Sequence, residues 1–147
     1  MQLYRHILLA ADFSEHGKTV STKAKRLAEQ NQARLSLIHV VDYLPVTDAT
    51  YGPIIPFDVD LTEELTKIAE QRLADIGQEL GVDKQHQWLE IGSPKLEIVR
   101  MAEENQVDLI VVGSHGRQGL AVLLGSTASG VIHHAHCDVL AVRFKDD

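Results

Sequence analysis

The stretch VDLIVVGSHGRQGLAVLLGST, residues 107–127, decides the fold expected for this chain. It begins with an apolar run from Val107 to Val112, broken only by Asp108, which predicts a short strand buried on both faces. A loop follows that is rich in glycine, and a backbone without Cβ atoms can pass close to a bound group. The loop glycines are Gly113, Gly116 and Gly119.

The same stretch ends at the expected start of a helix. Gly125, Ser126 and Thr127 precede a segment of helical character, and the first backbone amides of a helix bind anions. Strand, glycine loop and helix start together predict a cradle for phosphate groups.

The composition predicts one soluble domain over residues 1–147. A chain of 147 residues with 44% hydrophobic residues is large enough for one ordinary core. The formal net charge of -7 provides no basic field for DNA or RNA, so we do not expect nucleic acid as a partner. No apolar run reaches the roughly 18 residues of a membrane span, and the first residues do not resemble a signal peptide. With the single cysteine Cys137, the expected location is the cytoplasm.

Strands and helices are expected to alternate along the chain. The predicted strands are residues 7–11, 33–42, 85–91, 107–112 and 138–144. The first predicted helix starts after the N-cap Ser14, and the second is capped by Asp60 or Thr62. The third starts at Pro94 after the N-cap Ser93, and the fourth starts at Thr127. They end near Asn31, Leu80, Asn105 and Ala135. Strands separated by helices of this length form a parallel sheet with right-handed crossovers.

The long loop after the second strand and the helix that follows it carry further expectations. Residues 43–58 hold several prolines and no period, so they predict a long loop, either a flap over a site or a plain surface excursion. The apolar residues from Leu61 to Leu80 recur at helical spacing and predict one apolar stripe along the second helix. Gly81 is expected to end that helix.

The candidate site follows from the predicted sheet. In open parallel sheets, ligands bind beyond the carboxyl ends of the strands, where the strand order reverses. Asp12, Val40, Asp42 and Gly113 all lie at such carboxyl ends. The sequence therefore places the candidate site at this edge.

These segments resemble the universal stress protein family over essentially the whole chain. The matching pieces are HILLAADFSE at 6–15, LIHVVD at 37–42, VDLIVVGSHG at 107–116 and LLGSTASGVIHHAHCDVLAVR at 123–143. The resemblance implies a single-domain α/β fold of the adenine nucleotide alpha hydrolase-like type. Its sheet would be open, parallel and five-stranded, in the order 3-2-1-4-5, with helices on both faces. That order places Asp12 and Gly113 on either side of one crevice.

One branch of this family binds ATP through glycine, two residues, glycine, nine residues, glycine, and then serine or threonine. Gly113, Gly116 and Gly125-Ser126 match its fixed positions, but only eight residues lie between Gly116 and Gly125. The branch without nucleotide has this shorter loop and lacks the glycines, so the chain is intermediate. Either Gly119 lets the loop tighten, or Ser126 moves out of reach of the phosphates.

The resemblance also implies roles for single residues, with ATP or AMP as the ligand and no metal beyond nucleotide-associated Mg. Asp12 would lie near the base or ribose, and the backbone of Val40 would contact adenine. The phosphates would be surrounded by Gly113, Gly116, Gly125, Ser126 and Thr127, with His115 and Arg117 at the rim. Arg117 has an equally weighted alternative as a solvent-facing loop residue.

Three functions remain open from the sequence. The first is a dimeric stress-response protein that binds ATP or a related adenine nucleotide as a signal. The second, favoured by the short loop, is a nucleotide-independent interaction protein. The third is a slow ATPase, for which the sequence offers no convincing base with an orienting group. By resemblance, a homodimer would form through the last strand, Val139 to Phe144, whose apolar edge needs a cover.

The histidines offer minor alternatives. His133 and Cys137 lie four residues apart and suit a transition metal, but no second cluster completes a ligand set, so we expect no metal site. His39 is read as a core histidine. No nucleophile elbow and no Walker sequence occurs, which argues against a dedicated hydrolase or kinase.

Overall fold

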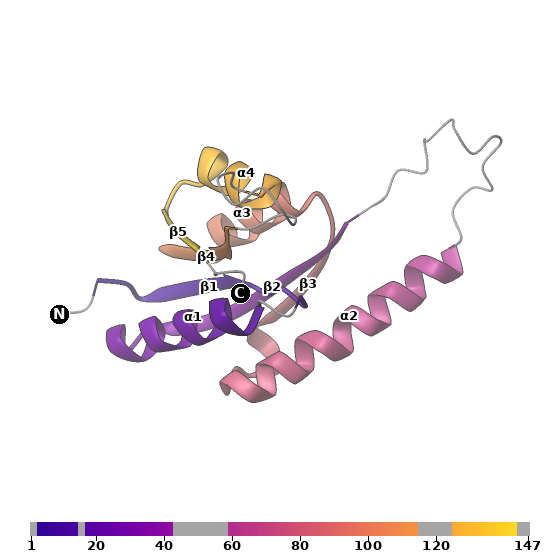
Figure 1. The fold of residues 1–147 in the computed structure, drawn as a ribbon, viewed down its shortest axis with the longest axis horizontal. Coiled ribbons are helices and arrows are strands. Elements are labelled where there is room, and N and C mark those ends of the chain that lie inside the picture. Colours follow the sequence, from indigo (N-terminus) through magenta and orange to yellow (C-terminus); the bar gives the residue numbers. More distant parts are fainter. Residues whose placement is uncertain (1–2, 15–16, 43–58, 115–124, 144–147) are drawn as a thin grey trace.

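The computed structural model describes residues 3–14, 17–42, 59–114 and 125–143. It shows one five-stranded parallel sheet in the predicted order, β3-β2-β1-β4-β5 (Figure 1). The strands are β1 (His6–Ala10), β2 (Arg34–Asp42), β3 (Gln87–Gly92), β4 (Leu109–Gly113) and β5 (Asp138–Val142). The helices are α1 (Gly17–Asn31), α2 (Val59–Leu80), α3 (Pro94–Glu104) and α4 (Ser126–His134), with a short 3-10 helix η2 (Lys84–His86) before β3. Within these ranges, no helix is long and apolar enough to cross a membrane.

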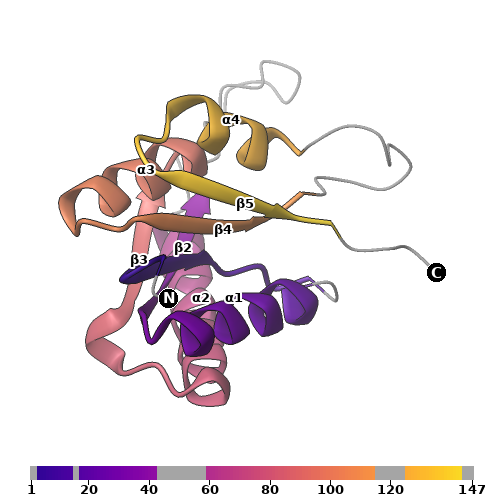
Figure 2. The same cartoon turned by 90° about the vertical axis from the view of Figure 1, so that its left-hand side faces the viewer.

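Helices cover both faces of the sheet, as the fold class predicts (Figure 2). Alternate strand residues point to opposite faces, so β1 sends Ile7 and Leu9 into one core and Leu8 into the other. The first core lies under α1 and α2 and includes Val20, Ala24, Ala28 and Leu73. The second lies under α3 and α4 and includes Ile98, Ala102, Ala128 and Val131.

The central strand β4 begins later than predicted. Val107 and Asp108 precede it, because both residues hold the connection from α3 into the sheet. The Val107 N–H donates to the carbonyl oxygen of Ala102 at 2.9 Å. The Asp108 carboxylate accepts the backbone N–H groups of Arg5 at 2.9 Å and His6 at 3.0 Å. The aspartate that interrupts the apolar run therefore ties the start of β4 to the start of β1.

Helix α2 differs from its prediction at its N-terminal end. It begins at Val59, so Asp60 and Thr62 lie inside the helix and the predicted cap at either residue is wrong. The predicted apolar stripe is buried only in part, since Leu65 is 43% exposed and Ile68 is 50% exposed. The C-terminal half packs on the sheet through Leu73. Gly81 ends the helix with a φ of 71°, which confirms its predicted role.

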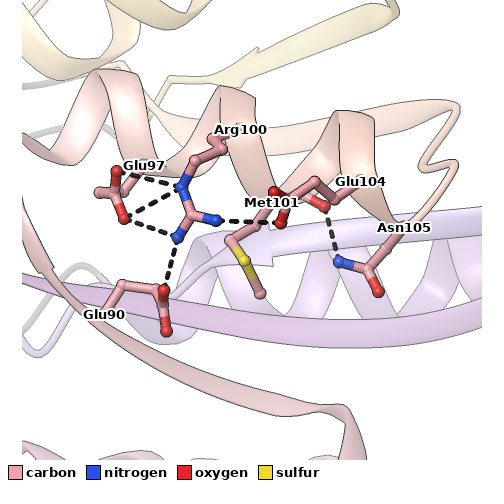
Figure 3. Close-up of polar contacts among 6 residues, drawn as sticks. All are labelled: Glu90, Glu97, Arg100, Met101, Glu104 and Asn105. Atoms are coloured by element: carbon pink, nitrogen blue, oxygen red, sulfur yellow. Dashed lines mark hydrogen bonds and ion pairs between the residues drawn. The ribbon is translucent and has the colours of Figure 1, made fainter.

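The edge strand β3 is joined to α3 by a cluster of charged side chains (Figure 3). The Arg100 guanidinium donates to Glu97 at 2.8 Å, to Glu90 of β3 at 2.6 Å and to Glu104 at 2.9 Å. Hydrogen bonding to Glu97, followed by the charges of the carboxylates, raises the pKa of Arg100. Helix α3 itself starts as predicted, with Ser93 as N-cap and Pro94 in the first turn.

Strand β5 forms the other edge of the sheet. It ends at Val142, whereas the prediction extended the strand to Phe144, which lies outside the described residues. Val139, Leu140 and Ala141 are half-buried in the single chain. The long loop predicted at residues 43–58 also lies outside the described part of the chain.

Candidate functional site

A cavity of about 560 Å³ opens at the carboxyl edge of the sheet, where β1 and β4 are neighbours. It lies at the reversal of strand order, which is where open parallel sheets bind ligands. The cavity brings together the described members of the predicted site, which are Asp12, Val40, Gly113, Gly125, Ser126 and Thr127. His115, Gly116 and Arg117 lie outside the described residues, and the binding role of all nine stays a prediction.

The first turn of α4 borders this cavity. Gly125 is the N-cap and provides no side-chain cap, and its N–H donates to the Ser114 carbonyl oxygen at 2.7 Å. The next amides belong to Ser126, Thr127 and Ala128, three residues that line the cavity. A helix leaves its first N–H groups without intrahelical partners, and no described residue accepts from these three. The turn therefore offers the cavity three backbone donors.

The backbone of Val40 lies on the cavity side of β2. Pairing between β1 and β2 ends at Ala10 and Ile38, and the Ala11 N–H then donates to the Ile38 carbonyl oxygen at 2.8 Å. Alternate residues of a strand direct their N–H and C=O groups to the same neighbour. The N–H and C=O groups of Val40 therefore point to the β1 side of β2, at a level where β1 has already ended.

Asp12 is held in a tight turn immediately after β1. One of its carboxylate oxygens accepts the Ser14 N–H at 2.8 Å, an Asx turn that fixes the side chain at the end of the strand. The second oxygen is not used in this bond. Asp12 thus presents a carboxylate acceptor to the cavity that it lines.

Phe13, His39 and Arg72 also line the cavity, and none of these three residues belongs to the predicted site. The rings of Phe13 and His39 lie 4.1 Å apart between centroids, tilted by 34°. The Arg72 guanidinium carbon lies 5.7 Å from the Phe13 ring centroid, within the range of a cation–π contact. The sequence predicts His39 to be a core histidine because it lies within the apolar run of β2, but the structure places it in the lining of the cavity. Arg72, from the middle of α2, carried no local signal.

The remaining cavity wall is largely apolar. Its apolar residues are Ala10, Ala11, Ile38, Pro94, Ile98, Val112 and Ala128, and Ser14 also contributes to it. A volume of this size with apolar walls and a few polar groups is typical of a site for a small organic ligand. Within the described ranges, no group of three His, Cys, Asp or Glu side chains is arranged to hold a metal ion. Burial raises the pKa of the Cys137 thiol, which keeps it in its neutral form.

Comparisons with known proteins agree with this architecture. The structure of hypothetical protein MJ0577, the subject of a structure-based assignment of biochemical function, is similar with a TM-score of 0.79 and 30% identity, covering 99% of each chain. A universal stress protein crystallised in complex with cAMP is similar with a TM-score of 0.61 over 95% of this chain and 96% of that chain, at 24% identity, which supports the fold alone.

The sequence comparisons are more specific. Universal stress protein A homolog 2 of Coxiella burnetii is 40% identical over 146 residues, which cover 99% of either chain. The model of the Universal stress protein family matches residues 3–143. The chain therefore belongs to the universal stress protein family.

Proposed function

We propose that this protein binds an adenine nucleotide, ATP or AMP, as a signal in the stress response, with little or no turnover. The observation that carries the proposal is the first turn of α4, where the N–H groups of Ser126, Thr127 and Ala128 border the cavity without a described acceptor. Phosphate oxygens are the natural acceptors for such a turn, because the helix dipole adds partial positive charge there.

The rest of the cavity suits a nucleoside attached to those phosphates. The exposed peptide edge of Val40 offers one donor and one acceptor to a base, and Asp12 offers an acceptor to ribose hydroxyls. The apolar wall can cover the faces of a purine ring. That a universal stress protein has been crystallised with cAMP supports the view that this fold can house an adenine nucleotide.

The proposal includes a homodimer in the cytoplasm and no resident metal beyond Mg that accompanies the nucleotide. Strand β5 lies at the edge of the sheet with apolar, half-buried residues, and pairing with a second copy would cover that edge. The single cysteine fits a reducing compartment. No catalytic residue is assigned.

The test is to purify the protein without added nucleotide, denature it, identify any released small molecule by mass spectrometry, and then titrate the protein with ATP. Released adenine nucleotide, or binding in the micromolar range, is the expected result. An empty protein that gives no heat with ATP would contradict the proposal. It would instead favour the nucleotide-independent alternative, to which the eight-residue spacer between Gly116 and Gly125 points.

A further inference from the structure

His39 lies in the C-terminal half of β2 and lines the cavity beside Val40. Two contacts fix the plane and direction of its ring. Its Nδ1 atom lies 3.4 Å from the carbonyl oxygen of Ala11, and its face packs on Phe13 at 4.1 Å between centroids. A ring held in this way presents its remaining nitrogen in one defined direction.

The contact with Ala11 decides which nitrogen carries the proton. A carbonyl oxygen can only accept a hydrogen bond, so Nδ1 must be the protonated atom. In the neutral imidazole, Nε2 is then an acceptor. Among the described residues, Nε2 has no hydrogen-bond partner. The atom is also not fully buried, because no fully buried polar side-chain atom of the described residues lacks a partner.

The neutral state is favoured at this position. Burial lowers the pKa of His39, although the Ala11 carbonyl and the Asp12 carboxylate act in the opposite direction. The Arg72 guanidinium, which faces the same Phe13 ring, also lowers it. Asp12 and Arg72 are the charged groups that act on this ring from the end of β1 and from α2. At neutral pH the Nε2 atom of this cavity-lining residue is therefore an acceptor.

We infer that His39 selects the base: its Nε2 atom accepts a hydrogen bond from an exocyclic amino group, so the cavity prefers a 6-aminopurine to a 6-oxopurine. This inference rests on the proposed nucleotide site and names the residue that makes it specific for adenine. A 6-oxopurine would bring its own acceptor toward Nε2, and two facing acceptors leave both atoms without a donor.

The experiment compares ATP with ITP, which differ in the amino or oxo group at position 6 of the purine. Calorimetric titration of wild type should show that ATP binds about tenfold tighter than ITP or more. The difference arises because Nε2 of His39 has a hydrogen-bond donor in the ATP complex and none in the ITP complex. His39→Phe keeps an aromatic ring against Phe13 and removes the acceptor. This variant should lose about tenfold in ATP affinity while its ITP affinity stays unchanged.

His133→Phe is the matched control, because His133 is an exposed residue of α4 that does not line the cavity. It should behave as wild type toward both nucleotides. An ATP to ITP preference that survives in His39→Phe, or that is missing in wild type, would overturn the role of His39 while leaving the nucleotide site intact. If wild type binds neither nucleotide, the proposed function itself fails.

A second measurement needs no variant. Protonated His39 has two N–H donors and no acceptor, so the preference for ATP should fall in acid. Because the pKa is lowered, the ratio of the two affinities should be constant between about pH 7 and pH 8 and should decline only below about pH 6.5. The ratio cancels the ionisation of the phosphates, which both nucleotides share. A ratio independent of pH down to unfolding would also overturn the inference.

Discussion

The Nε2 atom of His6 lies 2.7 Å from the hydroxyl oxygen of Ser36, and both residues are buried between β1, β2 and the end of α3. On the other side of the ring, Nδ1 lies 3.2 Å from the carbonyl oxygen of Asn105. Because that carbonyl accepts, Nδ1 is the protonated nitrogen and Nε2 accepts from the Ser36 hydroxyl. The two bonds satisfy both nitrogens of a neutral imidazole.

The free energy of unfolding should therefore fall in mild acid. Burial lowers the pKa of His6, so the unfolded chain binds a proton at a pH where the folded chain does not. The stabilisation is fully present above the unfolded value of about 6.5 and is lost as the pH falls below it. Urea unfolding between about pH 8 and pH 5 measures this slope, which should be smaller in His6→Gln. His134→Gln, an exposed control, should keep the slope of wild type; equal slopes in all three proteins would contradict the assignment.

Arg100 should contribute to stability only at low ionic strength. Its three carboxylate partners hold the edge strand β3 against α3, but the cluster is exposed, so salt screens the attraction. Arg100→Met should lower the melting temperature in dilute buffer and have no measurable effect at about 1 M NaCl. Arg34→Met removes an exposed arginine for which no ion pair with a described residue is seen, and it provides the comparison. A loss of the same size at both salt concentrations would show that Arg100 acts through packing.

The proposed dimer can be tested at one backbone position of β5. The Val142 carbonyl accepts from Ser114 on the β4 side at 2.9 Å, so Leu140 also directs its backbone to β4, whereas Ala141 directs its N–H outward. Ala141→Pro therefore removes an edge donor without removing a bond to β4. Sedimentation analysis should show wild type as a dimer and this variant as a folded monomer. Leu140→Pro, which removes a donor within the sheet, should instead destabilise the fold; a dimeric Ala141→Pro protein would exclude pairing through β5.

The parallel sheet and most element positions were predictable because they depend on local signals and on the rules for parallel strands. The order of the strands was predicted only through the resemblance to the family, and the structure confirms it. The apolar run before Gly113 marks β4, and Gly81 marks the end of α2. The errors have tertiary causes. Asp108 binds the backbone at the start of β1 and so delays β4. At the N-terminal end of α2, Leu65 and Ile68 repeat at helical spacing and still remain exposed, which periodicity alone cannot reveal.

The candidate site was predictable to the extent that it depends on strand ends and on the α4 start. Asp12 and Val40 lie at strand ends, and Ser126 lies at a recognisable helix start. The side wall was not predictable, because Arg72 reaches Phe13 from a helix far away in the sequence. The role of His39 depends on the contact of its ring with Ala11, which only the folded chain provides.

The most direct test of the central claim is a titration of Ser126→Asp with ATP. Ser126 is the first residue of α4 and lines the cavity. A negative charge there stabilises a helix, so the melting temperature should not fall, but it repels phosphate and should weaken ATP binding by about tenfold or more. Ser129→Asp carries the same charge on an exposed residue of α4 that does not line the cavity, and it should bind as wild type. Equal ATP affinity in all three proteins would contradict a phosphate site at the start of α4.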